Sequence, residues 1–326
     1  MTRVAITGAS GHVGANLVRL LIERGYDVCA VVHGDSRGVE GLACRQVSGS
    51  VLDPLSLCEA FKSAEYVFHL AAIITLTRDR SGMVWRTNVE GTKNVVDACV
   101  ACGVRKLIQC SSIHAFSAYP LEELITESRA LATEPNLPDY DRSKVGGELE
   151  ALKGIERGLE VVIINPTAVV GPNDFKPSRM GKFLLEVKAG KMPAVVEGGF
   201  NWVDARDVSL GAEAAARLGK SGGRYLLAGT QKSLLDLSRI ACEITGTTPP
   251  RFASPIWMAH MALPFGALVS AITGKEQKFT SDSLRAVTHH QKISHEKASR
   301  ELGYAARPLQ ETISDTYKWF VDAGYA

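Results

Sequence analysis

Short apolar runs and longer stretches with one apolar face alternate along the first half of the chain. Residues 4–7 form a β-branched run that ends in glycines, and residues 15–22 then have the spacing of an amphipathic helix. Apolar runs predict further strands at 28–32, 45–47, 66–72, 106–110 and 161–164, with helices between them, including one over 140–155. Nearly continuous apolar strands alternating with helices are typical of a parallel sheet covered on both faces. The pattern therefore predicts an α/β fold built on a doubly wound parallel sheet.

The pattern changes after residue 170. Helices are predicted there at 180–189, 207–218 and 234–245, with a loop at 198–202, a returning strand at 225–227 and a polar, helical tail at 283–326. We therefore expect one domain over residues 1–170 and a smaller, mostly substrate-binding lobe over residues 171–326. Elements near 203–230 are expected to fold back onto the first domain.

The most apolar segment is 255–269. His260, Pro264 and Gly266 interrupt it, so it lacks the continuous span of about 20 apolar residues that crosses a bilayer. We expect a pair of buried helices that cap the substrate pocket, and we consider membrane association the less favoured alternative.

Composition narrows the class of protein. The 326 residues are 45% hydrophobic and 22% charged, with a formal net charge of +2, which gives no electrostatic reason to expect nucleic acid or an anionic membrane as partner. The seven cysteines are an odd number, and most lie in strand-like or helix-like runs, which favours reduced thiols in a cytoplasmic protein. Cys99-x-x-Cys102 ends a predicted helix without a second ligand pair, so no metal site is predicted. No signal or transit peptide is expected, because the first predicted strand begins at once.

The glycines Gly8, Gly11 and Gly14 stand between the first strand and the first helix. Glycines allow a sharp turn and a close approach to a pyrophosphate, and the helix N-terminus offers unpaired N–H groups and a positive dipole end. In this strand–turn–helix context the spacing predicts a dinucleotide site, and residues 1–170 a dinucleotide-binding domain. The alternative is a tight turn that binds no ligand.

Tyr140 and Lys144 are four residues apart and so share a face of the predicted helix. A tyrosine hydroxyl has a pKa near 10, and a neighbouring ammonium is expected to lower it. Ser111 and Ser112 end a strand at the carboxyl edge of the sheet, where a hydroxyl can bond a substrate oxygen. Taken alone, the Tyr–Lys pair is common on helix surfaces, but beside a nucleotide site the set predicts proton transfer.

These motifs resemble the extended short-chain dehydrogenase/reductases, and within them the dihydroflavonol-reductase-like enzymes. The likeness rests on the glycine turn, His69-Leu70-Ala71-Ala72, Asn88-Val89-x-Gly91-Thr92, the serine pair, Tyr140-x-x-x-Lys144, Asn165-Pro166-Thr167 and the tail around Glu301-Leu302-Gly303-Tyr304. The resemblance implies a Rossmann-type fold and a catalytic triad of Ser112, Tyr140 and Lys144. Tyr140 would act as acid and base, Lys144 would tune it and hold the nicotinamide ribose, and Ser112 would polarise the carbonyl. The cofactor-binding set so implied is Gly8, Ser10, Gly11, His12, Val13, Gly14, His33, Arg37, Ser50, Val51, Leu70, Ala71, Ala72, Ile74, Asn88, Tyr140, Lys144, Asn165, Pro166 and Thr167.

Departures from the family pattern bear on the cofactor. Ser50 stands where the family often has an aspartate for the adenine amino group, and the nearby Asp53 is explained by helix capping. His33 occupies the position of the acid that binds the ribose 2′-OH in NAD-preferring members, and Arg37 follows four residues later. We therefore expect NADP rather than NAD. The alternative is that Arg37 points to solvent.

Two further departures bear on the substrate. Phe200-Asn201-Trp202 stands where sugar-nucleotide epimerases carry an arginine for the nucleotide phosphates, and Ile113-His114 replaces the acidic pair of the 4,6-dehydratases. The residues expected at the substrate are Ile74, His114, Phe116 and Phe200. Such a pocket suits a hydrophobic carbonyl compound, so we expect reduction of a ketone or aldehyde to an alcohol, or the reverse. A sugar-nucleotide epimerase/dehydratase and a non-catalytic NADP-binding protein remain alternatives, and the resemblance suggests a homodimer.

Overall fold

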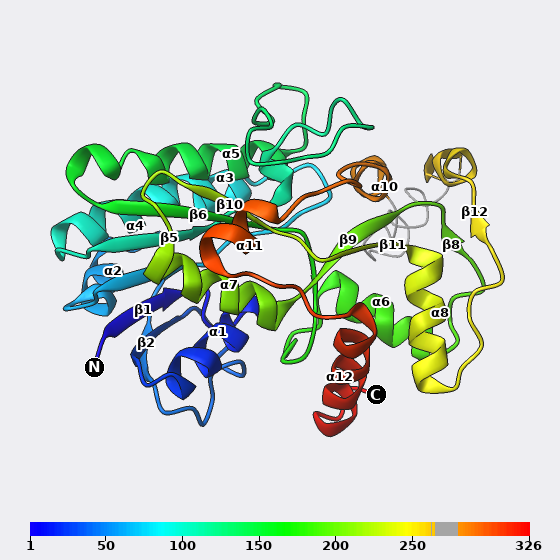
Figure 1. The fold of residues 1–326 in the computed structure, drawn as a ribbon, viewed down its shortest axis with the longest axis horizontal. Helices are drawn as coiled ribbons and strands as arrows, with labels where there is room; N and C mark the ends of the chain where they lie inside the picture. The colour runs from blue at the N-terminus through cyan, green and yellow to red at the C-terminus, as the bar shows by residue number, and fades with distance from the viewer. Residues whose placement is uncertain (262, 265–279) are drawn as a thin grey trace.

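A computed structural model describes residues 1–261, 263–264 and 280–326 of the chain (Figure 1). Seven parallel strands form the central sheet in the spatial order β3-β2-β1-β4-β5-β6-β10. The strands are β1 (Arg3–Thr7), β2 (Asp27–Val32), β3 (Arg45–Ser48), β4 (Tyr66–His69), β5 (Lys106–Cys110), β6 (Glu160–Pro166) and β10 (Arg224–Leu227). The predicted doubly wound parallel sheet of Rossmann type is confirmed. β4 is shorter than predicted, because the chain leaves the sheet after His69.

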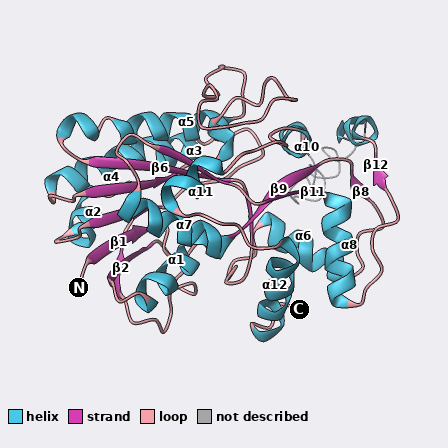
Figure 2. Ribbon diagram, in the orientation of Figure 1, coloured by secondary structure: helices cyan, strands magenta, loops and turns pink. Residues whose placement is uncertain are grey.

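Helices cover both faces of this sheet (Figure 2). One face packs against α1 (His12–Glu23), α7 (Ala205–Leu218) and α11 (Glu296–Leu302). The other face packs against α2 (Pro54–Phe61), α4 (Gly91–Ala101) and α5 (Asp139–Leu152). Each face of the sheet has its own hydrophobic core, and successive residues of β1 point to opposite faces. Val4 and Ile6 lie in the core beneath α1 and α7, and Ala5 lies in the core beneath α2 and α4. Asp53 caps α2 by accepting from the Leu55 N–H at 3.1 Å, as its position before Pro54 predicts.

The chain enters α4 through a short irregular stretch. α3 (Met83–Trp85) continues into a π-helical turn (Arg86–Glu90), and α4 follows directly. Two 3-10 turns, Ile113–Ala115 and Ile155–Arg157, follow β5 and α5. Ser112, one of the predicted catalytic residues, immediately precedes the first of these turns.

The second lobe is built on two small sheets. β7 (Ala168–Val170), β9 (Gly199–Asp204) and β11 (Thr230–Ser233) form one, and β8 (Val195–Val196) pairs with β12 (Ala253–Ser254) in the other. Their core is closed by α6 (Arg179–Lys188), α8 (Leu234–Thr245) and α12 (Leu309–Asp322).

Two expectations for this lobe are wrong. Residues 199–204 form a strand rather than a loop, because β9 pairs with β11 on one side and β7 on the other, contacts between distant segments that local composition does not encode. The tail is not one polar helical stretch: α10 (Ser281–Thr288), α11 and α12 are separate, and they bury Leu284, Leu302 and Phe320.

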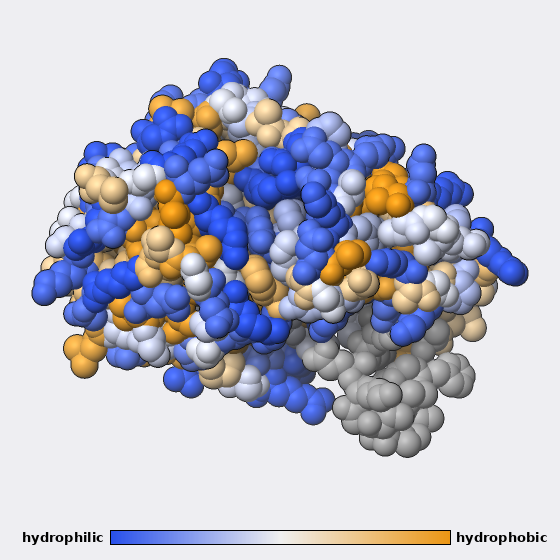
Figure 3. Space-filling model, turned by 90° about the horizontal axis from the view of Figure 1, so that it is seen from below, coloured by the Kyte–Doolittle hydropathy of each residue, from blue (hydrophilic) through white to orange (hydrophobic). Residues whose placement is uncertain are grey.

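The apolar segment 255–269 lies only partly within the described residues. Residues 256–261 are helical, and Trp257, Met258 and Met261 are 60%, 47% and 67% exposed. This part is therefore not the buried cap that we expected. No helix within the described ranges is long and apolar enough to cross a membrane. On the face shown in Figure 3, hydrophobic residues form separate patches among hydrophilic ones.

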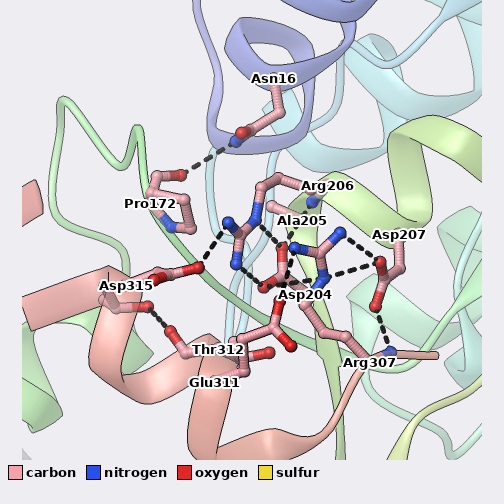
Figure 4. A network of polar contacts seen from close by, with 12 residues as sticks. Asn16, Pro172, Asp204, Ala205, Arg206, Asp207, Arg307, Glu311, Thr312 and Asp315 are labelled. Atoms are coloured by element: carbon pink, nitrogen blue, oxygen red, sulfur yellow. Dashed lines mark hydrogen bonds and ion pairs between the residues drawn. The ribbon is translucent and has the colours of Figure 1, made fainter.

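A network of buried charges fastens the C-terminal lobe to the sheet (Figure 4). Arg307 donates to both oxygens of Asp207, from its backbone N–H and its Nε, each at 2.8 Å. Arg206 donates from Nη2 to Asp204 at 2.7 Å and from Nη1 to Asp315 of α12 at 2.6 Å. Because Asp204 and Asp207 are each 2% exposed, the network replaces their lost hydration with ion pairs.

Candidate active site

The glycine turn lies at the carboxyl end of β1, and the space available for a side chain differs among its three glycines. Gly8 has φ +70°, and a Cβ there would lie 2.6 Å from the Ala71 nitrogen. A Cβ on Gly14 would overlap the Gly8 carbonyl oxygen, whereas one on Gly11 would come no closer than 3.3 Å to another residue. Gly11 is the N-cap of α1, and no side chain caps that helix. The first turn of α1 therefore keeps backbone N–H groups for a ligand, an arrangement that fits a dinucleotide pyrophosphate.

His12 and Asn16 use their side chains to hold the second lobe against this turn. His12 Nε2 lies 3.0 Å from the Gly171 carbonyl oxygen and 3.1 Å from that of Pro172. Asn16 Nδ2 donates to the Pro172 carbonyl at 2.9 Å (Figure 4). The His12 imidazole is thus engaged by the protein, and the part of this residue that can face a nucleotide is its backbone N–H.

The loop after β2 lies against the glycine turn, because a Cβ on Gly38 would come within 2.7 Å of the Ser10 carbonyl oxygen. His33 is exposed. Arg37 donates from Nη2 to Asp35 Oδ2 at 2.6 Å, and this hydrogen bond lowers the pKa of Asp35 to about 2. Arg37, which we predicted to bind the 2′-phosphate of NADP, is therefore paired with Asp35 in this structure. The sequence reasoning overlooked this acidic partner.

A chain of buried polar side chains runs from β1 to α5 behind the site. Thr7 Oγ1 lies 2.6 Å from His69 Nδ1, and His69 Nε2 lies 3.1 Å from Thr92 Oγ1. Thr92 donates to the Asn88 carbonyl at 2.7 Å. Burial lowers the pKa of His69 to about 3, so its imidazole is neutral and acts as a hydrogen-bonding link.

Asn88 ends this chain by holding the segment that follows β4. It accepts from the Ile73 N–H at 2.8 Å and donates to the Ile73 carbonyl and to Ser143 Oγ, each at 2.9 Å. Leu70, Ala71 and Ala72 precede this anchor, and Leu70 N–H donates to the Thr7 carbonyl at 3.1 Å. Ile74, directly after it, is 65% exposed.

Ser50 and Val51 follow β3. Ser50 Oγ accepts from the Leu52 N–H at 3.2 Å, and the Ser50 N–H donates to Ser56 Oγ at the same distance. Val51 is buried and packs against Gly91, where a Cβ would come 2.6 Å from Val51 Cγ2. The contacts of these two residues thus stabilise the end of this strand, and their place beside the adenine stays a prediction.

Ser112, Tyr140 and Lys144 come together where β5 ends and α5 begins. All three are buried, and Ser112 lies close enough to Tyr140 to lower its pKa in part. Ser112 Oγ also accepts from the His114 N–H at 3.2 Å. Lys144 Nζ donates to the Cys110 carbonyl at 3.1 Å and lies 5.8 Å from the centre of the Tyr140 ring.

The expected lowering of the Tyr140 pKa is wrong for this structure. Burial raises the pKa of Tyr140, and the Ser112 hydroxyl lowers it only in part. The physical reason is that the ammonium lies beside the ring and bonds the Cys110 carbonyl rather than the hydroxyl. Burial also lowers the pKa of Lys144.

Asn165 and Thr167, on either side of Pro166, connect the end of β6 to the site. Asn165 Nδ2 donates to the Ser112 carbonyl at 3.0 Å. Thr167 Oγ1 donates to Asn201 Oδ1 at 2.9 Å, and the same oxygen accepts from the Gly229 N–H at 2.7 Å. Asn201, which occupies the place of the epimerase arginine region, therefore ties β9 to the sheet edge.

Two cavities flank the catalytic candidates on the substrate side. Phe116 and Asp141 line one of about 170 Å³, and His114, Thr167 and Phe200 line another of about 80 Å³. His114 Nδ1 lies 3.1 Å from Asp141 Oδ1, and its ring centre lies 5.7 Å from that of Tyr140. Three of the four predicted substrate residues thus line cavities beside Tyr140, and Ile74 lines neither.

The sequence reasoning missed two residues of this wall. Asp141 orients His114, and it directly follows the predicted tyrosine. His290, from the tail, lies 5.2 Å from His114 between ring centres and lines both cavities. Asp141 could have been predicted from the sequence because it directly follows Tyr140. His290 could not, because no neighbouring residue in the sequence indicates that it lies beside His114. Across the described residues, no group of three or more His, Cys, Asp or Glu side chains is placed to hold a metal ion, and the cysteines are free thiols.

Residues 4–228 match the family model described as the NAD dependent epimerase/dehydratase family. The chain belongs to this family. Its predicted membership of the extended short-chain dehydrogenase/reductases is thereby confirmed, as is the prediction of an NAD(P)-dependent enzyme.

Relatives of this epimerase/dehydratase family member span its whole length. A Synechocystis protein named "Putative dihydroflavonol 4-reductase" is 31% identical, over 98% of this chain and 95% of that one. "Sterol demethylase protein B" of Methylococcus capsulatus is 32% identical, over 98% of each chain. The crystal structure of gox2253 has a TM-score of 0.87 and 33% identity, covering 100% of this chain and 99% of that one.

Proposed function

We propose that the protein transfers a hydride between NADP(H) and a ketone or aldehyde of a hydrophobic molecule, with Tyr140 as proton donor. The observation that carries this proposal is that two buried hydroxyl-bearing residues, Ser112 and Tyr140, come together with Lys144 at the carboxyl edge of the sheet. The glycine turn lies at the same edge, at the end of β1. Ligands of doubly wound folds bind at this edge.

Each residue of the triad has a separate role in the proposal. The nicotinamide, when bound, supplies or accepts the hydride. Because burial raises the Tyr140 pKa, its phenol is protonated at neutral pH and can donate its proton to the carbonyl oxygen. Ser112 donates a hydrogen bond to that oxygen. Lys144, which here bonds the Cys110 carbonyl, would have to turn toward the Tyr140 hydroxyl before its ammonium could favour the phenolate left behind. Gly8, Gly11 and Gly14 would hold the pyrophosphate, with the N–H groups of His12 and Val13.

The substrate class is supported by the pocket and by the relatives. Phe116 and Phe200 give the two cavities aromatic walls, and His114 and Thr167 add polar groups. Two relatives are named for a dihydroflavonol and for a sterol, both of which are ring compounds. We infer that the substrate presents its carbonyl from an apolar framework of this kind.

NADP is proposed over NAD because of Arg37. Its guanidinium lies on the loop that packs against Ser10 of the glycine turn, where it can reach a ribose phosphate. Its ion pair with Asp35 must then open or be shared. Because both side chains are half-exposed, water can replace that pair at little cost.

The alternatives fit the site less well. Arg206, the nearest candidate for an epimerase phosphate ligand, is held by Asp204 and Asp315 and is not free to bind nucleotide. A protein that only binds NADP does not need Ser112, Tyr140 and Lys144 to lie together, because these residues serve proton transfer. Neither alternative therefore explains why all three are brought together.

The proposal is tested by following NADPH oxidation with flavonoid-like, steroid-like and short aliphatic ketones. We expect turnover with at least one ring-bearing ketone and weaker turnover with the aliphatic ones. Purification with tightly bound NAD, together with interconversion of a nucleotide sugar, would instead support the epimerase alternative.

A further inference from the structure

Glu148 continues the functional face of α5. Tyr140, Lys144 and Glu148 follow one another at a spacing of four residues, so all three point toward the sheet. Glu148 is 0% exposed, and a fully buried carboxylate is costly unless it is paired and hydrogen-bonded. The proposed proton transfer gives it no role, so its presence requires an explanation.

Both carboxylate oxygens of Glu148 are engaged by the end of the sheet. Oε1 accepts from Asn165 Nδ2 at 2.7 Å, and Oε2 accepts from Arg224 Nε at 2.7 Å. Arg224 begins β10, and Asn165 lies near the end of β6. Glu148 thus connects α5 to the two strands that end beside the site.

Asn165 links Glu148 to Ser112, one of the catalytic candidates. One hydrogen of its amide goes to Glu148 Oε1 and the other to the Ser112 carbonyl, at 3.0 Å. The opposite amide orientation would turn its oxygen against a carboxylate and a carbonyl, so the charge of Glu148 fixes which way the amide lies. The Ser112 backbone is therefore held from α5, the helix that carries Tyr140.

We propose that Glu148 is a positioning residue that keeps Ser112 in register with Tyr140 through Asn165. The inference rests on the roles proposed above for Ser112, Tyr140 and Lys144. It extends them, because it proposes that one buried carboxylate keeps the end of β5, with Ser112, aligned with α5, which carries Tyr140.

The charge of Glu148 also acts on Lys144. Burial lowers the pKa of Lys144, and Cys110 and Glu148 oppose that change. The other titratable groups that face the ammonium are Tyr140, on the same helix, and His69, on β4. Removal of the Glu148 charge should therefore lower the pKa of Lys144 further, and the ammonium should be lost at a lower pH.

The experiment compares Glu148→Gln with Glu213→Gln. Glu213 on α7 is a matched control, since it is 2% exposed and accepts from Arg24, Arg217 and Tyr26 on the opposite face of the sheet. A glutamine at 148 offers one acceptor where two donors converge, so we expect kcat to fall by about 10²-fold while KM for NADPH stays within about twofold. The alkaline limb of the kcat profile should move to lower pH. Glu213→Gln should leave kcat and the pH profile unchanged.

A double variant, Glu148→Gln with Arg224→Met, removes the unpaired guanidinium in case the single variant folds poorly. It should regain stability and, because Asn165 is then the one remaining donor to the glutamine oxygen, recover part of kcat while the alkaline limb stays at the lower pH. The inference is overturned if Glu148→Gln loses no more kcat than Glu213→Gln, or if its alkaline limb does not move. Tyr140→Phe separates this failure from that of the proposed function: full turnover in Tyr140→Phe would remove the function itself, whatever Glu148 does.

Discussion

The two halves of the molecule use buried polar side chains in different ways. In the parallel-sheet half, Thr7, His69 and Thr92 form a chain of uncharged hydrogen-bonding groups that leads into the site. Where the C-terminal lobe meets the sheet, the buried groups are ionised, with Arg307 against Asp207 and Arg206 against Asp204. The sheet half also buries paired carboxylates, such as Glu148 with Arg224 and Glu213 with Arg24. The groups that lead away from β1 are uncharged, however, and ion pairs join the two halves.

The proposed cofactor and substrate sites also draw differently on the two halves. The glycine turn depends on backbone contacts within the first half, because Gly8 and Gly14 have no room for side chains. The substrate wall needs both halves, since His114 from the first meets His290 from the tail. Disturbing the first half should therefore affect the cofactor, and disturbing the charged contact should affect stability.

The largest effect on cofactor binding is expected from Gly8→Ala. Its φ of +70° disfavours a side chain, and a Cβ would lie 2.6 Å from the Ala71 nitrogen, so the turn must shift. We expect the Kd for NADPH, measured by fluorescence titration, to rise by about 10²-fold or more. Gly25→Ala is the control, because Gly25 has φ +77° and nothing within 4 Å. Equal loss of affinity in both variants would show that backbone strain alone, and not the turn, governs binding.

Arg307→Ala should destabilise the junction between the halves. It leaves Asp207, 2% exposed, without its main partner, and breaking such a pair lowers the free energy of unfolding by about 3 kcal/mol. Arg3→Ala breaks the exposed pair with Asp27, whose side chains are 45% and 39% exposed, and should cost less than about 1 kcal/mol. Denaturant unfolding measures both. Similar losses would contradict the view that buried charges hold the junction.

The smallest effect is expected at the cofactor ribose. Arg37→Ala should raise the Kd for NADPH about tenfold and leave that for NADH unchanged, because a charged hydrogen bond to the 2′-phosphate is lost. Asp35→Asn should act in the opposite direction by releasing Arg37. Arg45→Ala, which breaks the exposed pair with Glu59, controls for the loss of positive charge. A parallel change for NADPH and NADH would argue against NADP preference.

Local pattern was enough to predict the parallel-sheet half. The strands, the glycine turn and the cap at Asp53 depend on neighbouring residues, and their spacing is visible in the sequence. The second lobe depends on distant pairings, and for this reason β9 was mistaken for a loop. The sequence around Phe200 and Asn201 does not indicate that this segment pairs with β7 on one side and β11 on the other.

The triad residues could be named from the sequence, but their electrostatics could not. Residue spacing placed Tyr140 and Lys144 on one face, whereas the rise of the Tyr140 pKa depends on how completely the fold buries it. The same holds for Asp35, whose pairing with Arg37 is a property of the loop geometry. Spacing specifies which groups meet, whereas burial sets the pKa of Tyr140 and the hydrogen bond with Arg37 sets that of Asp35.

The central claim is net hydride transfer with Tyr140 as the proton donor. It is tested most directly with NADPH deuterated at the transferable position of the nicotinamide, using the native protein and Tyr140→Phe. We predict that deuterium appears on the carbinol carbon of the product and that Tyr140→Phe binds NADPH normally but turns over about 10³-fold more slowly. Retention of the label in the cofactor during inversion of a nucleotide sugar, or near-normal turnover in Tyr140→Phe, would contradict the claim.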